Sequence, residues 1–143
     1  MAQQWLSPAK SESYATLDLV ADAGIEYVCD WVNDDLPYAM RAGGKMLYAM
    51  PHPSDIDDYV ILAASHQTEE DLLNQICDHF DLLHAESQRG EGGRVMALTV
   101  HPWLIGQPYR IGVLEEALQH IMSRRGVWAA TGAEILAAFK AST

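Results

Sequence analysis

The sequence has few basic residues and no long apolar run, and each shortage excludes a class of protein. Its 143 residues include 9 Lys and Arg against 20 Asp and Glu, which gives a formal net charge of −11. Binding to nucleic acid or to a membrane surface requires clustered positive charge, so we expect neither partner. The N-terminal residues resemble neither a signal peptide nor a membrane span, and we expect a cytoplasmic protein.

Cysteine is also scarce. Cys29 and Cys77 each lie in an apolar run and neither belongs to a C-x-x-C pair. This pattern is typical of small buried side chains and argues against a disulfide framework or a thiolate metal site. Because 49% of the residues are hydrophobic, we expect one domain over residues 1–143 with its own core.

What the sequence does contain is an alternation of strand and helix patterns. Apolar runs rich in β-branched and aromatic residues predict strands at 25–32, 45–50, 94–100 and 127–129. Apolar residues at helical spacing predict helices at 13–23, 55–64 and 69–87, a helix opened by Pro108 and Tyr109, and a last helix after Thr131. Ser54, Thr68 and Thr131 are the expected N-caps of three of these helices.

This order indicates an α/β fold with a mostly parallel sheet and flanking helices. About four strands are too few to close a (β/α) barrel, which needs about eight. The sequence therefore predicts either a small open sheet or a partial, half barrel.

The feature that points to chemistry is a histidine at the end of a predicted strand. The run 94–100 ends abruptly in His101 and Pro102, and Asp30 similarly lies late in the strand 25–32. The carboxyl ends of parallel strands are where α/β proteins place catalytic groups, so these two side chains could converge. The alternatives are a hydrogen-bonded strand-end histidine and a turn-forming aspartate.

Several phrases together resemble one family. They are W-L-S-P at 5–8, A-G-I-E-Y-V-C-D-W-V-N-D-D-L-P-Y at 23–38, M-A-L-T-V-H-P-W-L-I-G-Q-P at 96–108 and G-V-W at 126–128. They are similar to the C-terminal half of polysaccharide deacetylases. The similarity is closest to the branch with chitin-deacetylase-like proteins and metal-independent allantoinases, and it covers nearly the whole chain.

The resemblance implies a distorted (β/α) barrel that hydrolyses C–N amide bonds. His101 matches the histidine that protonates the leaving amine in the family, and Asp30 matches the aspartate that holds it. A carboxylate bonded to an imidazole fixes its tautomer and raises its pKa, so that the ring can act as an acid near neutral pH.

The resemblance also implies what this sequence does not supply. Family members typically hold a divalent metal such as zinc with an aspartate and an H-x3-H pair, and a second aspartate acts as base. The sequence has no T-F-D-D stretch and no H-x3-H pair. His79 and His84, five residues apart, would point about 140° apart on a helix. We therefore predict no metal ligands in this chain.

Other residues are candidates for the substrate side. Trp31 and Trp103 could stack on the apolar faces of a sugar, or could be packing residues. His52 could point into the cleft. Residues 55–58, D-I-D-D, stand where the family has an E-x-N-D-like phrase, and the preceding P-H-P departs from the usual pattern. The expected ligand is an N-acetylated sugar or a ureide-like small molecule.

Two functions remain open. The first is a hydrolase of non-peptide C–N bonds that is inactive alone and needs a complementary chain carrying the N-terminal half. The second is a non-catalytic remnant, a half-barrel that binds a ligand or has a structural role. A half-barrel leaves open sheet edges and an apolar inner face, so we expect a homo-oligomer that covers them.

Overall fold

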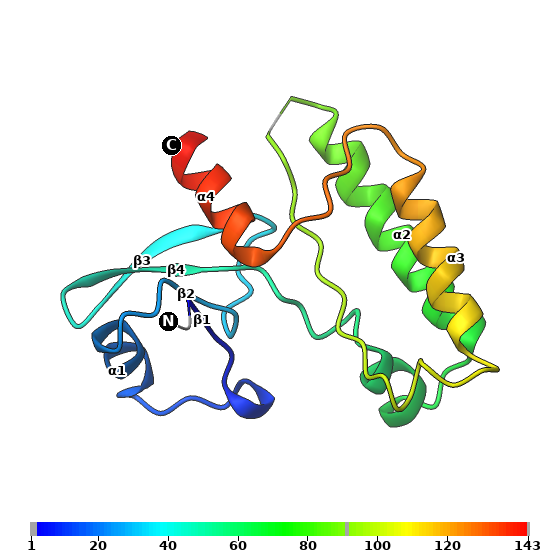
Figure 1. Cartoon of the computed structure of the whole chain (residues 1–143), viewed down its shortest axis with the longest axis horizontal. Coiled ribbons are helices and arrows are strands. Elements are labelled where there is room, and N and C mark those ends of the chain that lie inside the picture. Colours follow the sequence, from blue (N-terminus) through cyan, green and yellow to red (C-terminus); the bar gives the residue numbers. More distant parts are fainter. Residues whose placement is uncertain (1–2, 91, 143) are drawn as a thin grey trace. The chain divides into compact units, whose positions relative to one another are not determined.

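The computed structural model describes residues 3–90 and 92–142, which form two compact units. The first, here called the sheet unit, comprises the described residues 3–52 and 129–142, and the second, the helical unit, comprises the described residues 53–90 and 92–128. Figure 1 shows the elements of both units. The expectation of a single domain stays a prediction.

The sheet unit contains an open four-stranded sheet. Its strands are β1 (Gln4–Trp5), β2 (Tyr27–Val28), β3 (Tyr38–Ala42) and β4 (Lys45–Ala49), in the order β1-β2-β4-β3. β1 and β4 both run parallel to β2, whereas β3 pairs with β4 as an antiparallel hairpin. Gly43 and Gly44 connect that hairpin with φ angles of 56° and 79°, a left-handed turn that suits the twist of the two strands.

The two faces of this sheet are covered by different helices. Val20 and Ala21 of α1 (Thr16–Asp22) belong to one apolar cluster with Leu47 of β4. On α4 (Gly132–Ser142), Phe139 packs edge-on against Tyr48, with ring centroids 6.4 Å apart. Successive side chains of a strand point to opposite faces, so α1 and α4 lie on opposite sides of β4 (Figure 1).

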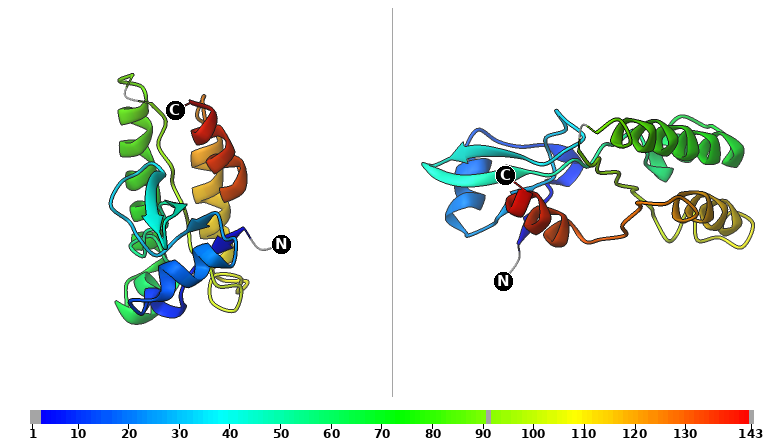
Figure 2. Two further views of the ribbon diagram at one scale, coloured as in Figure 1. Left: turned by 90° about the vertical axis from the view of Figure 1, so that its left-hand side faces the viewer. Right: turned by 90° about the horizontal axis from the view of Figure 1, so that it is seen from above.

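The helical unit is built on two long helices that run side by side in the same direction. α2 (Glu69–Ser87) and α3 (Ile111–Met122) are joined near their starts by Arg110 and Glu69, 2.7 Å apart, and near their ends by His120 and Asp81, 2.9 Å apart. Residues 94–100 carry the chain back alongside these helices before α3 begins (Figure 2). Parallel neighbouring helices are the arrangement that a βαβα repeat produces.

The core of the helical unit is apolar and draws on every element of it. It is formed by Ile56, Ile61, Leu62, Leu72, Ile76, Leu104, Ile105 and Ala117. Ile61 and Leu62 come from the short π-helix η2 (Tyr59–Ala64), which leads the chain towards α2. This core supports the turn that carries the candidate site.

The predicted helices with side-chain caps are confirmed. α2 begins after Thr68, whose hydroxyl accepts from the backbone N–H of Asp71 at 3.1 Å while the Asp71 carboxylate accepts from the Thr68 N–H at 2.9 Å. Thr131 and Glu134 form the same reciprocal pair before α4. Capping hydrogen bonds of this kind can be predicted from the sequence, because the two partners lie three residues apart in the chain.

The predicted fold class is confirmed, but with different strands. Residues 94–100 and 127–129 form no strand, which corrects both predictions; Thr99 alone makes a parallel bridge, to Asp57. A strand forms only where a neighbouring strand completes its backbone hydrogen bonds, and these two segments lack such a neighbour over most of their length. β1 and β3 replace them in the sheet. The predicted helix at 55–64 begins only at Tyr59, and the carboxylate of Asp57, not the hydroxyl of Ser54, accepts from its first N–H groups.

No helix among the described residues is both long enough and apolar enough to cross a membrane.

Candidate functional site

The helical unit holds a closely bonded aspartate–histidine pair. Nδ1 of His101 lies 2.6 Å from Oδ1 of Asp58, and the backbone N–H of His101 donates to Oδ2 of the same carboxylate at 2.8 Å. Asp58 therefore holds both the main chain and the ring of His101. Because an ionised carboxylate only accepts, Nδ1 is the donor and Nε2 is left as the ring atom that can exchange a proton.

Local backbone contacts place this pair. The N–H of Asp58 donates to the carbonyl of Thr99 at 3.1 Å, and the N–H of Thr99 donates to the carbonyl of Ile56 at 3.1 Å. Residues 55–58 therefore lie beside the segment that leads to His101. The two segments are aligned by the single parallel bridge between Asp57 and Thr99.

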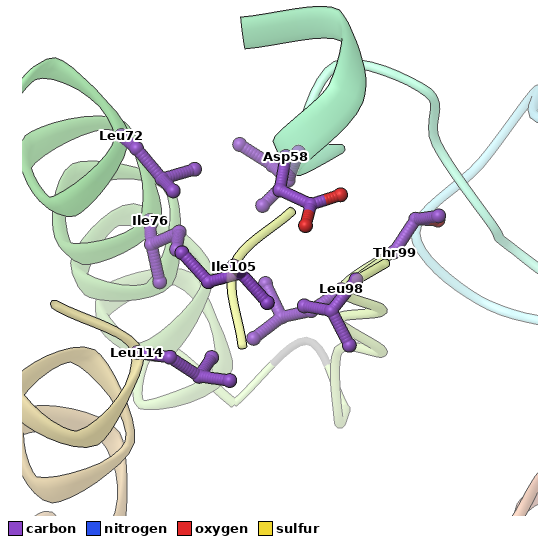
Figure 3. Close-up of a pocket in the computed structure, with 9 residues that line it drawn as sticks. Asp58, Leu72, Ile76, Leu98, Thr99, Ile105 and Leu114 are labelled. Atoms are coloured by element: carbon purple, nitrogen blue, oxygen red, sulfur yellow. The ribbon is translucent and has the colours of Figure 1, made fainter. Parts of the chain in front are cut away.

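Asp58 is the buried end of the site. It is 1% exposed and its carboxylate lies beside a small pocket otherwise lined by apolar side chains and Thr99 (Figure 3). The labelled apolar residues around it are Leu72, Ile76, Leu98, Ile105 and Leu114. A carboxylate in such surroundings needs hydrogen-bond donors, and His101 supplies two. The pocket is at the lower limit of what holds one water molecule, so it is a packing defect and not a substrate cavity.

His101 is the open end of the site. Its hydrogen bond to Asp58 raises the pKa of the imidazole above its usual value, burial opposes this, and the charges of Asp58 and Asp57 add to the increase. The side chain is 36% exposed, and no hydrogen bond to Nε2 exists among the described residues. The ring is thus held at one nitrogen, favoured in its charged form, and free to donate from the other.

Two aromatic rings flank the histidine. The centroid of the Tyr59 ring lies 5.9 Å from that of His101, the centroid of Trp103 also lies 5.9 Å from it, and Tyr59 and Trp103 are 6.2 Å apart. A tight turn after His101 sets the position of Trp103, because the His101 carbonyl accepts from the N–H groups of Leu104 and Ile105 at 2.8 and 3.0 Å.

Asp57, Asp58 and His101 bring three ligand-type atoms within 4.8 Å of one another. Most of these ligand atoms already make hydrogen bonds, however. Asp58 uses both oxygens on His101, and Oδ1 of Asp57 accepts from the N–H groups of Tyr59 and Val60 at 2.8 and 3.3 Å. The residues fit a hydrogen-bonded ion pair and not an open coordination site, so we assign no chemical step to a metal held by them.

Asp30 has hydrogen-bond partners within the sheet unit. Its Oδ1 accepts from the backbone N–H of Ser7 at 2.8 Å and its Oδ2 from the Ser7 hydroxyl at 3.1 Å. Within the helical unit the carboxylate that holds His101 is that of Asp58, because the one-residue bridge at Thr99 brings residues 57 and 58 to the histidine. The pairing of Asp30 with His101 would join the two units and stays a prediction. A catalytic role for Asp30 stays a prediction.

The remaining predicted site residues fall in both units. Trp31 lies in the sheet unit, where its Nε1 donates to the carboxylate of Glu12 at 3.2 Å. The His52 carbonyl accepts from the Lys10 ammonium in the same unit. Trp103 lies in the helical unit beside His101. Substrate contacts by these three residues stay predictions.

Sequence reasoning missed two residues of the site, Asp58 and Tyr59. A signal for Asp58 was present, because the phrase 55–58 stands in the place of the family's polar E-x-N-D-like phrase. The role of carboxylate partner to His101 is predicted for Asp30 instead, because the family's D-W motif matches there. Tyr59 carried no signal, since a tyrosine at the start of a helix is ordinary.

Comparison with known proteins agrees with this picture. No protein-family model matches the chain. A protein of Schizosaccharomyces pombe named "Putative polysaccharide deacetylase" is 31% identical over 122 residues, which cover 78% of this chain and 38% of that protein. The chain thus spans well under half the length of this curated relative.

Solved structures give the same result for the fold. The crystal structure of Puue allantoinase matches with a TM-score of 0.86 and 26% identity, over 98% of this chain and 46% of that one. A probable polysaccharide deacetylase from Pseudomonas aeruginosa PAO1 matches with a TM-score of 0.82 and 26% identity, over 97% of this chain and 46% of that one. In sequence and fold the chain is therefore polysaccharide deacetylase-like, and it corresponds to about half of such a protein.

Proposed function

We propose that this chain is part of a hydrolase that cleaves non-peptide C–N bonds, of the deacetylase and allantoinase kind, and that His101 is its general acid. The observation that carries the proposal is the Asp58–His101 pair, with Nδ1 held at 2.6 Å and Nε2 unpartnered among the described residues. A catalytic acid needs this combination of a fixed ring, a raised pKa and a free, exposed proton.

The proposed step is a single proton transfer. The imidazolium of His101 gives the proton on Nε2 to the leaving nitrogen as the C–N bond breaks, and neutral imidazole remains with its Nδ1–H on Asp58. Asp58 stabilises the charged form before the transfer and fixes the tautomer after it. Asp58 is a positioning residue, since among the described residues its carboxylate makes hydrogen bonds only to His101.

The chain supplies only part of the machinery that amide hydrolysis needs. General acid catalysis is worth about 10²–10⁴-fold, and a water-activating base or metal must supply most of the rest. Both oxygens of Asp58 accept from His101, and Oδ1 of Asp57 accepts from the start of η2, so we assign neither residue to that role. We therefore propose that the chain is inactive alone and that a complementary N-terminal half, bearing T-F-D-D and H-x3-H motifs, completes the site.

Co-expression with such a half tests the proposal. We expect the purified chain to release no acetate from N-acetylated sugar oligomers, with or without added zinc, and the assembled pair to release it. Its pH–rate profile should fall at high pH through the pKa of His101, because the acid form is lost there. Turnover by the chain alone would refute this proposal. So would an assembled pair that releases acetate at the same rate with and without the substitution His101→Gln.

The unpaired edges of the open sheet favour association with another protein chain. Within the described residues β1 pairs only with β2 and β3 only with β4, so both outer edges of the sheet are unpaired. Exposed strand edges favour association with another chain. In the absence of the complementary half we propose a homo-oligomer that covers these edges, and a monodisperse monomer in light scattering would contradict it.

A further inference from the structure

The outer edge of β3 carries backbone groups that point away from the sheet. The N–H of Tyr48 on β4 donates to a carbonyl beside β2 at 3.1 Å, so Tyr48 faces away from β3. Its register partner on β3 is Ala39, and this pair therefore exchanges no hydrogen bonds. Because bonded and non-bonded pairs alternate along an antiparallel ladder, the N–H and C=O groups of Ala39 and Arg41 both face outwards.

These outward groups have no strand partner in the described part of the chain. β3 pairs only with β4 and is the last strand of the sheet (Figure 1). Ala39 and Arg41 are both exposed. With five residues, β3 offers a longer edge than β1, which has two. An exposed edge of this length is a template for an added strand.

We infer that a second copy of this chain occupies this edge, with the two β3 strands antiparallel about a two-fold axis at Met40. In this register Tyr38 lies opposite Ala42 of the other copy, so the whole of β3 is paired. Ala39 of each copy exchanges both backbone hydrogen bonds with Arg41 of the other. The inference rests on the proposed homo-oligomer, and it names the surface and the register through which the copies meet.

Neighbouring registers use the edge less well. A shift by one residue sets the outward-facing groups against residues that face β4, so no hydrogen bonds form. An axis at Arg41 sets two guanidinium groups directly opposite each other, which is destabilising. An axis at Ala39 sets Arg41 opposite Pro37, which has no N–H to donate. The axis at Met40 avoids all three defects.

The charges at the two ends of the strand favour an antiparallel partner. Asp34 and Asp35 precede β3, and Arg41 lies near its end, so the strand is acidic at one end and basic at the other. Antiparallel pairing brings the acidic start of one copy to the basic end of the other. A parallel partner would bring like charges together. The complementarity is therefore that of β3 with itself.

The apolar side chains fit the same two-fold axis. Met40 and Ala42 belong to the apolar cluster that β3 shares with α1. In a non-hydrogen-bonded pair the side chains of the two strands are closest, so the two Met40 side chains would join the clusters of both copies. Arg41 points to the opposite face of the sheet, where Ala39 of the other copy is too small to obstruct its side chain.

A disulfide across the axis tests the pairing and its register. Non-hydrogen-bonded partners have Cα atoms about 4.5 Å apart, within the range that a disulfide spans. We expect Met40→Cys to give a covalent dimer on mild oxidation, seen by non-reducing electrophoresis. Ala39→Cys is the matched control, because its two substituted positions lie diagonally about 7–8 Å apart and should not link. The parent chain, with Cys29 and Cys77, gives the background.

Removal of an outward N–H tests the hydrogen bonds. Ala39→Pro deletes a donor that faces the second copy and keeps the pairing with β4, since proline is tolerated on an edge strand. We expect the dimer Kd from analytical ultracentrifugation to rise by about tenfold or more, because two symmetry-related hydrogen bonds are lost.

The other edge of the sheet supplies the matched control for this variant. The Trp5 carbonyl accepts from the N–H of Cys29 at 2.9 Å, so Trp5 faces β2 and Gln4 faces outwards. Gln4→Pro makes the same change there and should leave the dimer Kd unchanged. Circular dichroism verifies that both proline variants are folded.

The outcomes separate this inference from the proposals above. A dimer that Ala39→Pro leaves unchanged, or that Met40→Cys does not link, would overturn pairing along β3, while a homo-oligomer through another surface stands. A linked dimer in Ala39→Cys alone would overturn the register. A parent chain that stays monomeric would refute this inference and the homo-oligomer together. None of these measurements involves acetate release, so a failure of the hydrolase function is recognised separately.

Discussion

Two aspartates of this chain, Asp58 and Asp30, each accept two hydrogen bonds from one residue, and yet their surroundings give them different chemistry. Asp58 is held by the ring and the backbone of His101, so its charge acts on a group that titrates near neutral pH. Asp30 is held by the backbone and hydroxyl of Ser7, which carry no charge at any relevant pH. The partner, and not the carboxylate, decides which site can move a proton.

The surroundings of the two sites strengthen the contrast. Beside Asp30, burial raises the pKa of Glu12 and the nearby Asp30 carboxylate adds to the increase. The thiol of Cys29 is buried and its pKa is raised to about 11, first by burial and then by Asp30, so it is inert at neutral pH. Beside Asp58 the same kind of negative charge favours a protonated imidazole. In one cluster negative charge raises the pKa of neighbouring acids, whereas in the other it raises the pKa of an exposed imidazole.

The largest expected effect is on turnover. In the assembled enzyme His101→Gln should lower kcat by about 10²–10⁴-fold, because the leaving nitrogen loses its acid. Asp30→Asn should lower kcat far less, because Ser7 can still donate to the amide oxygen. Acetate release under saturating substrate measures both. A loss in Asp30→Asn that matches His101→Gln would break the comparison.

The turn that carries His101 offers a second test. A Cβ on Gly106 would lie 2.3 Å from the carbonyl oxygen of Pro102, whereas a Cβ on Gly93 would meet nothing within 4 Å. Gly106→Ala should therefore destabilise the protein by about 1–3 kcal/mol through forced displacement of the turn. Gly93→Ala is the matched control, and denaturant unfolding measures both. Equal midpoints would show that the turn is not rigid.

The amide variants of the two aspartates should also differ in stability. Asp58→Asn removes an ionic hydrogen bond at a 1% exposed position, and we expect a loss of about 1.5–3 kcal/mol. Asp30→Asn keeps an acceptor for neutral donors and should cost about 0.5–1.5 kcal/mol. Urea titrations at neutral pH give the ranking. The reverse order would mean that Asp30 holds the more important contacts.

The smallest expected effect is the pH dependence of stability. His101 has a raised pKa in the folded state, so its contribution is fully present below its ordinary pKa of 6.5 and is lost as pH rises through the folded value. The imidazole is 36% exposed, and screening should keep the change under about 1 kcal/mol. Asp58→Asn should flatten this component, and Asp30→Asn should leave it unchanged.

Local signals made much of the fold predictable. The bounds of α2 and the caps of α2 and α4 follow from residues three positions apart. The strands were harder, because β1 has two residues and exists only through pairing with β2. The hairpin strand β3 was not predicted, and residues 94–100 have a strand composition without enough neighbours to pair with.

The site was half predictable for a similar reason. His101 was visible from its position after an apolar run, and Trp103 followed from the same phrase. The partner of His101 depends on a bridge between residues 57 and 99, which no local pattern encodes. The resemblance to the family predicts Asp30 as the partner, whereas the geometry of the helical unit gives Asp58, and the pairing with Asp30 stays a prediction.

The most direct measurement is the pKa of His101 itself, followed by the NMR shifts of its ring protons across pH in the parent, Asp58→Asn and Asp30→Asn. If Asp58 holds the ring, the pKa is raised in the parent, falls towards its ordinary value in Asp58→Asn, and is unchanged in Asp30→Asn. A pKa that falls in Asp30→Asn and persists in Asp58→Asn would contradict the assignment of the acid's partner.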